Sequence, residues 1–299
     1  MEKETLVLPA ANQPISFEDH WITLDGARMR YLRDGLGPPL LLLHGLLGYS
    51  FSWRYAIPAL ANNYTVHAVD MLGVGFSDRP PELDCCLHAS AQRLLRFLDA
   101  AGMVSCDLLG TSHGGAVAMR AAAIAPERIH RLILVAPVNP WSLYGSRMAA
   151  FLSNPWVAPV FQRVAPFLKF AHGRLLRNLY GDPRRIRPGT LEGYSAPFSM
   201  PGAFQYGLSV LRTWQPDLRE LELSLPRISH IPTLLLWGAE DNAVDPASAQ
   251  RLKQEFHDCR VRMLPGVGHL PYEEVPDEFN REVAAFLEST SRAFRREGS

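Results

Sequence analysis

Hydrophobic residues along the chain alternate between short continuous runs and longer stretches with helical spacing. The short runs have the length of buried strands and lie at residues 40–43, 65–69, 106–109, 131–136, 233–237 and 260–264. Between them, helices are expected at residues 51–61, 87–101, 115–125 and 271–287. Because strands alternate with helices, the pattern predicts an α/β fold with a doubly wound, mostly parallel sheet. An Asp25-Gly26 pair between two apolar segments adds a hairpin near the start.

The alternation stops between residues 138 and 230, where no run reads as a strand. This segment is rich in aromatic residues and prolines, and strand-like runs resume at residue 233. We therefore expect a helical cap at residues 138–230, inserted into a core made of residues 1–137 and 231–299. Its charged side chains between residues 141 and 190 are basic except Asp182. This bias favours an anionic substrate, an anionic membrane surface or pairing with acidic parts of the chain.

A nucleophile candidate follows the run at 106–109. Residues 110–114 read G-T-S-H-G, which places Ser112 on a sharp turn between a strand and a helix. A serine hydroxyl needs a base and a group that orients the base. Asp241 and His269 each follow a later strand, so they would meet Ser112 at the carboxyl edge of a parallel sheet.

Taken together, these segments resemble the α/β-hydrolase family with a cap. Residues 41–48 resemble its oxyanion strand and His-Gly turn. Residues 69–78 resemble its D-x-P-G-x-G-x-S loop, with Leu72 in place of the proline. Residues 237–241 and 268–269 resemble its acid and base loops, so motifs in the family's order extend over most of the chain.

The resemblance implies a mechanism. Ser112 would attack a carbonyl carbon, His269 would move the proton, and Asp241 would orient the imidazole. The backbone N–H groups of Leu46 and His113 would hold the oxyanion. No metal or organic cofactor is needed, and the substrate would be a small-molecule ester. The candidate pocket residues are Trp141, Trp214 and Leu270.

Other carboxylates compete with Asp241 for the role of the acid. Asp245 precedes Pro246, as in a helix cap. Glu240 adjoins Asp241, but the family pattern favours the aspartate. Asp70 has a structural loop role in the family, and residues 137–139, after the strand that follows the serine, contain no carboxylate.

Composition excludes some classes of function. With 30 basic and 30 acidic side chains, the chain has no net charge, which argues against a nucleic-acid partner. We expect no stable membrane insertion, because the longest apolar stretch is too short to span a bilayer. No secretory signal is visible, and the four cysteines, Cys85, Cys86, Cys106 and Cys259, are expected to be free thiols. A cytoplasmic location follows as a prediction, whereas the oligomeric state is open.

Several activities fit these residues. A carboxylesterase is the main hypothesis; the alternatives are a C–C bond hydrolase of meta-cleavage diketone acids, a lactonase or a thioesterase. A non-catalytic ligand receptor is a further alternative, against which the intact triad argues. Epoxide hydrolases and haloalkane dehalogenases share the capped fold but use an aspartate where this chain has Ser112.

Overall fold

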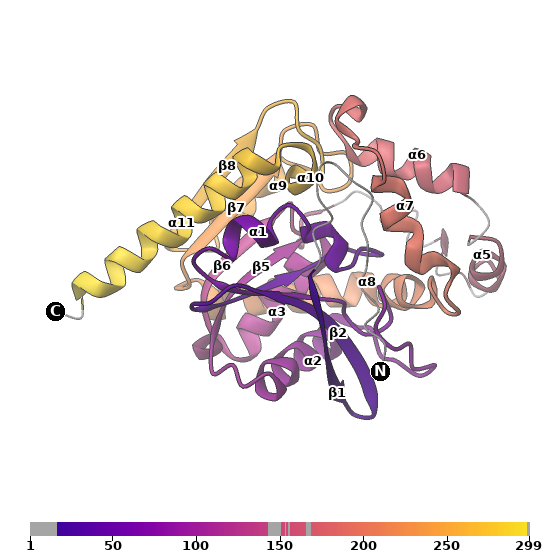
Figure 1. Ribbon diagram of the computed structural model, residues 1–299, viewed down its shortest axis with the longest axis horizontal. Helices are drawn as coiled ribbons and strands as arrows, with labels where there is room; N and C mark the ends of the chain where they lie inside the picture. Colours follow the sequence, from indigo (N-terminus) through magenta and orange to yellow (C-terminus); the bar gives the residue numbers. More distant parts are fainter. Residues whose placement is uncertain (1–16, 143–150, 153, 155, 166–168, 298–299) are drawn as a thin grey trace.

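One eight-stranded sheet forms the centre of the molecule, in the order β1-β2-β4-β3-β5-β6-β7-β8 (Figure 1). The structure is a computed structural model, which describes residues 17–142, 151, 152, 154, 156–165 and 169–297. The strands are β1 Glu18–Leu24, β2 Ala27–Asp34, β3 Pro39–Leu43, β4 Thr65–Val69, β5 Cys106–Thr111, β6 Ile129–Val135, β7 Thr233–Gly238 and β8 Cys259–Leu264.

Strands β3 to β8 run parallel, while β1 and β2 are antiparallel at one edge. Asp25 and Gly26 close the β1–β2 hairpin with φ of 51° and 80°, as the turn pair predicted. The chain passes from β3 to β4 on one side and later continues from β5 on the other. Ligand sites in such sheets lie where this direction reverses, here between β3 and β5. The predicted fold class is confirmed.

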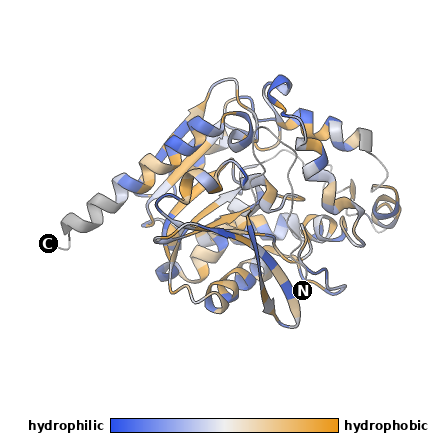
Figure 2. Ribbon diagram, in the orientation of Figure 1, coloured by the Kyte–Doolittle hydropathy of each residue, from blue (hydrophilic) through white to orange (hydrophobic). Residues whose placement is uncertain are grey.

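Helices cover both faces of the sheet. On one face lie α2 Leu87–Ala100, α3 His113–Ile124 and α9 Ser248–Lys253; on the other lie α1 Ile57–Leu60 and α11 Pro276–Glu297. Leu41 and Leu43 point into the first layer and Leu40 and Leu42 into the second, because successive strand residues face opposite ways. Figure 2 shows apolar strands between helices that carry polar residues on their outer faces.

Two predicted helices are interrupted. The expected helix at 51–61 consists of a 3₁₀ turn at Ser50–Trp53 and the short α1. All four residues of the turn are buried, including Ser50 and Ser52, so burial here does not follow one face of a helix. The expected helix at 271–287 divides into α10 Pro271–Glu274 and α11, because Pro276 disfavours helical geometry at Val275.

Between β6 and β7 lies the segment of residues 136–232, here called the insert. Its described helices are α5 Ala158–Val164, α6 Lys169–Leu179, α7 Thr190–Ser195 and α8 Gln205–Ser224, and no strand occurs in its described part. Figure 1 shows α5, α6 and α7 at the end of the molecule opposite the tip of α11. Helix α8 packs against the core along its length, since Tyr206, Val210, Leu218 and Leu221 lie in the same layer as α2 and α3. Over the described residues, no helix combines the length and apolarity needed to cross a membrane.

Candidate active site

Ser112 occupies a strained turn between β5 and α3. Its φ is 52° and its ψ is −123°, a conformation that residues with a Cβ rarely adopt. The flanking glycines permit the turn, because a Cβ on Gly114 would lie 2.3 Å from the His44 carbonyl oxygen. One on Gly110 would lie 2.5 Å from the Gly114 oxygen. The turn therefore requires both glycines, and it leaves Ser112 partly exposed while its neighbours are buried.

The loop after β3 lies against Ser112. A Cβ on Gly45 would lie 3.1 Å from Ser112 Cβ and 3.7 Å from its Oγ. In the contacts of the described residues, the N–H of Leu46 donates no hydrogen bond, and the N–H of His113 opens a helix without an acceptor inside it. The two predicted oxyanion donors, Leu46 in the loop after β3 and His113 at the start of α3, thus flank the reversal point of the sheet.

Two buried histidines support these loops. The ring of His44 lies between the Gly45 oxygen, 2.8 Å from Nδ1, and the Met71 N–H, which donates to Nε2 over 3.1 Å. This pair of contacts fixes a neutral ring with the proton on Nδ1. Burial lowers the pKa of His44, and burial followed by the nearby His44 ring lowers the pKa of His113 to about 4. Both side chains are therefore neutral supports.

Asp241 and His269 meet at the same edge of the sheet. His269 Nδ1 donates to Asp241 Oδ2 over 2.8 Å, and both residues are buried. The other carboxylate oxygen of Asp241 accepts the N–H groups of Ala243 and Val244. The carboxylate is thus fixed, with one oxygen directed at the imidazole. No hydrogen bond joins Ser112 to His269 within the described part of the chain, which is common before substrate binds.

The competing carboxylates have other partners. Asp245 accepts the Ala247 N–H over 2.9 Å, just before α9, and Glu240 is exposed. Asp70 accepts hydrogen bonds from the Ser50 N–H at 2.7 Å and the Phe76 N–H at 3.0 Å. None of these three contacts His269 through a hydrogen bond in the residues that the structure describes.

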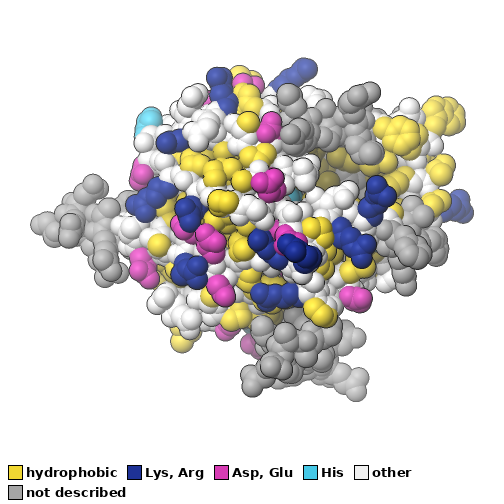
Figure 3. All heavy atoms as spheres, turned by 90° about the horizontal axis from the view of Figure 1, so that it is seen from above, with side chains coloured by type: hydrophobic (Ala, Val, Ile, Leu, Met, Phe, Trp, Pro, Cys, Tyr) yellow, Lys and Arg dark blue, Asp and Glu magenta, His cyan; other side chains and the backbone are white. Residues whose placement is uncertain are grey.

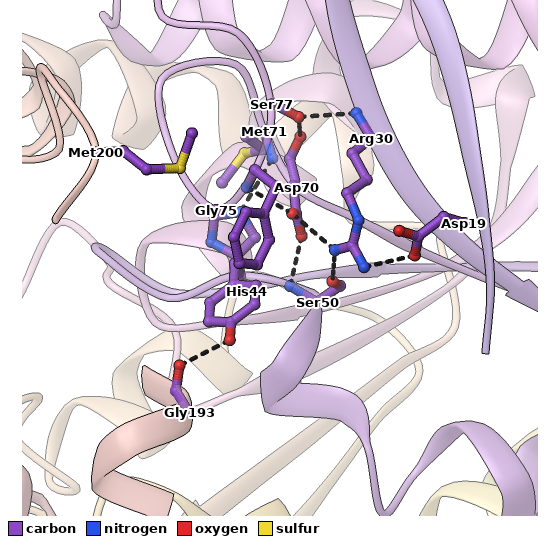
Figure 4. A network of polar contacts seen from close by, with 12 residues as sticks. Asp19, Arg30, His44, Ser50, Asp70, Met71, Gly75, Ser77, Gly193 and Met200 are labelled. Carbon is purple, nitrogen blue, oxygen red and sulfur yellow. Dashed lines mark hydrogen bonds and ion pairs between the residues drawn. The ribbon is translucent and has the colours of Figure 1, made fainter. Parts of the chain in front are cut away.

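Asp70 is the centre of a buried polar network shown in Figure 4. Arg30 on β2 donates to Asp70 from Nη1 over 3.1 Å and to Asp19 from Nη2 over 2.6 Å. The Ser77 hydroxyl donates to the Asp70 carbonyl over 2.6 Å and accepts the Arg30 N–H. These bonds hold the loop of residues 70–78 beside His44. The D-x-L-G-x-G-x-S segment therefore has a structural role, which is to fix the position of the His44 ring.

Glu274 was not predicted from the sequence and joins the histidine loop to the insert. Its carboxylate accepts the N–H groups of Gly268 at 2.6 Å, Gly181 at 3.1 Å and Asp182 at 3.2 Å. The His269 N–H in turn donates to the carbonyl of Leu179, the last residue of α6, over 2.7 Å. Burial raises the pKa of Glu274. The only sequence signal for Glu274 is its position shortly after His269 in the chain.

A second contact between core and insert involves Glu273. Arg54, after the 3₁₀ turn, forms a buried ion pair with Glu273 on α10, with Nη2 and Oε2 2.6 Å apart. Tyr194 on α7 donates to Glu273 Oε1 over 2.7 Å. The charged pair thus links α10 and the segment after the 3₁₀ turn to α7.

The candidate pocket residues lie in packed surroundings. Trp141 and Trp214 are half-buried against the layer of α2 and α3, and the Arg251 guanidinium lies 5.1 Å from the Trp141 ring centre. Leu270 is buried in the opposite layer. A cavity of about 210 Å³ lies between residues 73–85 and α8, and none of the three lines it.

No described group of histidine, cysteine and acidic side chains is arranged to hold a metal ion, and the four cysteines are free thiols. Residues 38–276 match the model of the alpha/beta hydrolase fold. The chain belongs to the α/β-hydrolase family.

Relatives in this family have several activities. Haloalkane dehalogenase 2 of Mycobacterium tuberculosis is 29% identical over 91% of this chain and 94% of its own length. The pimeloyl-[acyl-carrier protein] methyl ester esterase of Aeromonas hydrophila is 30% identical over 85% of this chain and 97% of its own. The crystal structure of a meta-cleavage product hydrolase superposes with a TM-score of 0.74 at 24% identity, covering 90% of this chain and 98% of that one. Family membership therefore leaves the substrate open.

Proposed function

We propose that the protein is a serine hydrolase that cleaves carboxylic esters. The observation that carries this proposal is the fixed bond from His269 Nδ1 to Asp241 Oδ2, at the edge where Ser112 stands on its strained turn. It leaves Nε2 of His269 as the nitrogen that can accept a proton. The similarity to an ester esterase supports the same chemistry.

In the proposed reaction, Ser112 Oγ attacks the ester carbonyl while His269 takes the hydroxyl proton. The oxyanion that forms is stabilised by the N–H groups of Leu46 and His113. Collapse of this intermediate releases the alcohol, which receives the proton from His269 and leaves an acyl group on Ser112. His269 then removes a proton from water, which attacks the acyl carbon. Collapse of this second intermediate breaks the bond to Ser112 Oγ, which receives the proton from His269, and the acid is released.

Residues 138–230 would act as a cap over this site in the proposed enzyme. Their position between β6 and β7 supports this, as do the contacts of Glu273 and Glu274 with α7 and with residues 181–182. A cap of this kind would exclude water and limit the size of the acyl or alcohol group. Because Tyr206, Val210, Leu218 and Leu221 pack in the same layer as α3, α8 would form the part of the cap that is fixed to the core.

Replacement of the nucleophile tests the proposal. Ser112→Ala should abolish hydrolysis of p-nitrophenyl butyrate and labelling by a fluorophosphonate probe, with the melting temperature preserved. Ser105→Ala, at the other end of the same strand region, is the matched control and should retain both properties. Labelling of Ser112→Ala, or turnover like that of the unmodified protein, would refute the assignment.

A second candidate is hydrolysis of a C–C bond in an anionic diketone acid. It is favoured by the basic character of residues 141–190 and by the likeness to a meta-cleavage product hydrolase. The two candidates differ in substrate and share Ser112. Faster turnover of a vinylogous diketone acid than of p-nitrophenyl esters would select this second reaction.

A further inference from the structure

An exposed apolar surface lies on the outer side of the insert. Trp156 is 86% exposed, Val160 63%, Phe151 60% and Val164 45%. Positions 156, 160 and 164 are four residues apart, so they follow one side of α5 and the turn before it. We call Phe151, Trp156, Val160 and Val164 the α5 ridge. Ala158 and Ala165 are buried on the other side of the same helix, so the ridge is not part of the core.

Basic side chains accompany the ridge. Arg163 lies on α5, and Arg174 and Arg177 lie on the next helix, α6; all three are exposed. In the ion pairs that the structure describes, none of them has a carboxylate partner. Figure 3 shows hydrophobic side chains gathered with basic ones at the end of the molecule that carries α5 and α6 in Figure 1.

We propose that the α5 ridge docks the protein on an anionic lipid surface. Tryptophan favours the boundary between lipid headgroups and acyl chains. Guanidinium groups bind phosphate, and each basic residue close to an anionic bilayer strengthens attachment. An exposed apolar stripe accompanied by arginines that have no carboxylate partner among the described residues therefore fits lipid phosphates. This docking leaves the sheet outside the membrane and does not depend on the proposed esterase activity.

A second copy of the chain fits this surface less well. A symmetric dimer places the same patch of each copy against the other, which would bring Arg163, Arg174 and Arg177 close to the same residues of the partner copy. Like charges at close range oppose such an interface. The charge of the patch thus favours a lipid surface over self-association.

The test is co-sedimentation of the full chain with vesicles. Vesicles of phosphatidylcholine and phosphatidylglycerol should bind the protein about 100-fold more tightly than vesicles of phosphatidylcholine alone, since each of the three arginines contributes about fivefold. Binding should weaken as salt is added. No binding to either vesicle, or equal binding to both, would overturn the proposal.

Variants locate the surface. Trp156→Ser with Val160→Ser should weaken binding to anionic vesicles about tenfold or more, because both apolar side chains leave the interface. The matched control is Trp21→Ser with Val104→Ser, which removes an exposed tryptophan and an exposed valine that lie outside the insert. Arg163→Glu with Arg174→Glu should weaken binding about 25-fold or more, whereas the exposed Arg281→Glu on α11 should not.

Loss of binding in the controls to the same extent would refute the location. Analytical ultracentrifugation without vesicles tests whether a second copy of the chain covers the α5 ridge instead. A dimer that Trp156→Ser with Val160→Ser dissociates would show that the ridge joins two copies, and would overturn lipid docking. Melting temperatures of all variants should match that of the unmodified protein, since the replaced side chains are exposed.

Discussion

Backbone strain at single residues gathers around the proposed site. Positive φ at non-glycine positions occurs, among the described residues, at Asp25, Leu47, Ser112 and Ala136. The last three follow β3, β5 and β6, whose carboxyl ends share one edge of the sheet. Such conformations cost about 1–3 kcal/mol each and persist where surrounding contacts enforce them. The strain therefore lies in the loops that would hold the nucleophile and the oxyanion.

The roles proposed for the acid and the base can be tested separately. His269→Ala should lower kcat for ester hydrolysis by at least about 10³-fold, and Asp241→Asn by a similar or somewhat smaller factor. The reason is that the bond between His269 Nδ1 and Asp241 Oδ2 fixes the tautomer that accepts the serine proton. Initial-rate kinetics with p-nitrophenyl butyrate measure both.

Asp245→Asn is the matched control for the acid. Asp245 accepts only a local backbone N–H, from Ala247, among its described side-chain contacts, so the variant should lose at most about 1 kcal/mol of stability. Its kcat should stay close to that of the unmodified protein. If Asp245→Asn is inactive and Asp241→Asn is active, the acid has been assigned to the wrong residue.

At the scale of elements, α10 connects the histidine loop with the insert. Glu274→Gln should reduce kcat at least about tenfold while KM changes little, because its carboxylate holds the Gly268 N–H next to His269. The amide keeps one oxygen acceptor but turns a donor toward backbone N–H groups. We expect a loss of stability of about 1–3 kcal/mol. Assays well below the melting temperature separate the two effects.

A positioning role predicts more than instability. The pH profile of kcat should shift in Glu274→Gln if His269 is displaced, and a purely structural role would leave it in place. Glu278→Gln on α11, whose partner is the exposed Arg262, is the control and should retain the kinetics of the unmodified protein. An unchanged kcat and pH profile in Glu274→Gln would contradict the positioning role.

Much of this arrangement could be read from the sequence, and the reason is local. The strands, the turn at Ser112 and the loops of Asp241 and His269 depend on short apolar runs and on glycines at fixed spacing. Glu274 and Arg54 depend on partners far away in the chain, Gly181 and Glu273, which no local pattern indicates. The only sequence signal for the helix break at Val275 is Pro276. The residues on either side keep helical spacing, so the pattern predicted one continuous helix.

At the scale of the whole molecule, buried histidines link stability to pH. Burial and then Arg33 lower the pKa of His67 on β4 to about 4, and His113 has a similar value. An unfolded histidine titrates near pH 6.5, so below that pH the unfolded chain binds more protons than the folded one. The free energy of unfolding should therefore fall as the pH is lowered from about 6.5 to about 4.

His67→Gln isolates one of these contributions. Between about pH 7 and about pH 5, the unmodified protein should lose about 2 kcal/mol more stability than the variant. Urea denaturation at the two pH values measures the difference. The exposed His257→Gln is the control and should follow the unmodified protein. Parallel pH dependence in His67→Gln and the unmodified protein would contradict the prediction.

The close approach of residues 179–182 to residues 268–274 limits how this family member can be recombined. A Cβ on Gly268 would lie 2.4 Å from the Gly181 nitrogen and 2.4 Å from the Leu179 oxygen. The two segments therefore fit only as a matched pair, although they are far apart in the chain. A chimera that takes its insert from a relative has to take residues 268–274 from the same relative. Exchange of the insert alone should misplace His269 even where every catalytic side chain is retained.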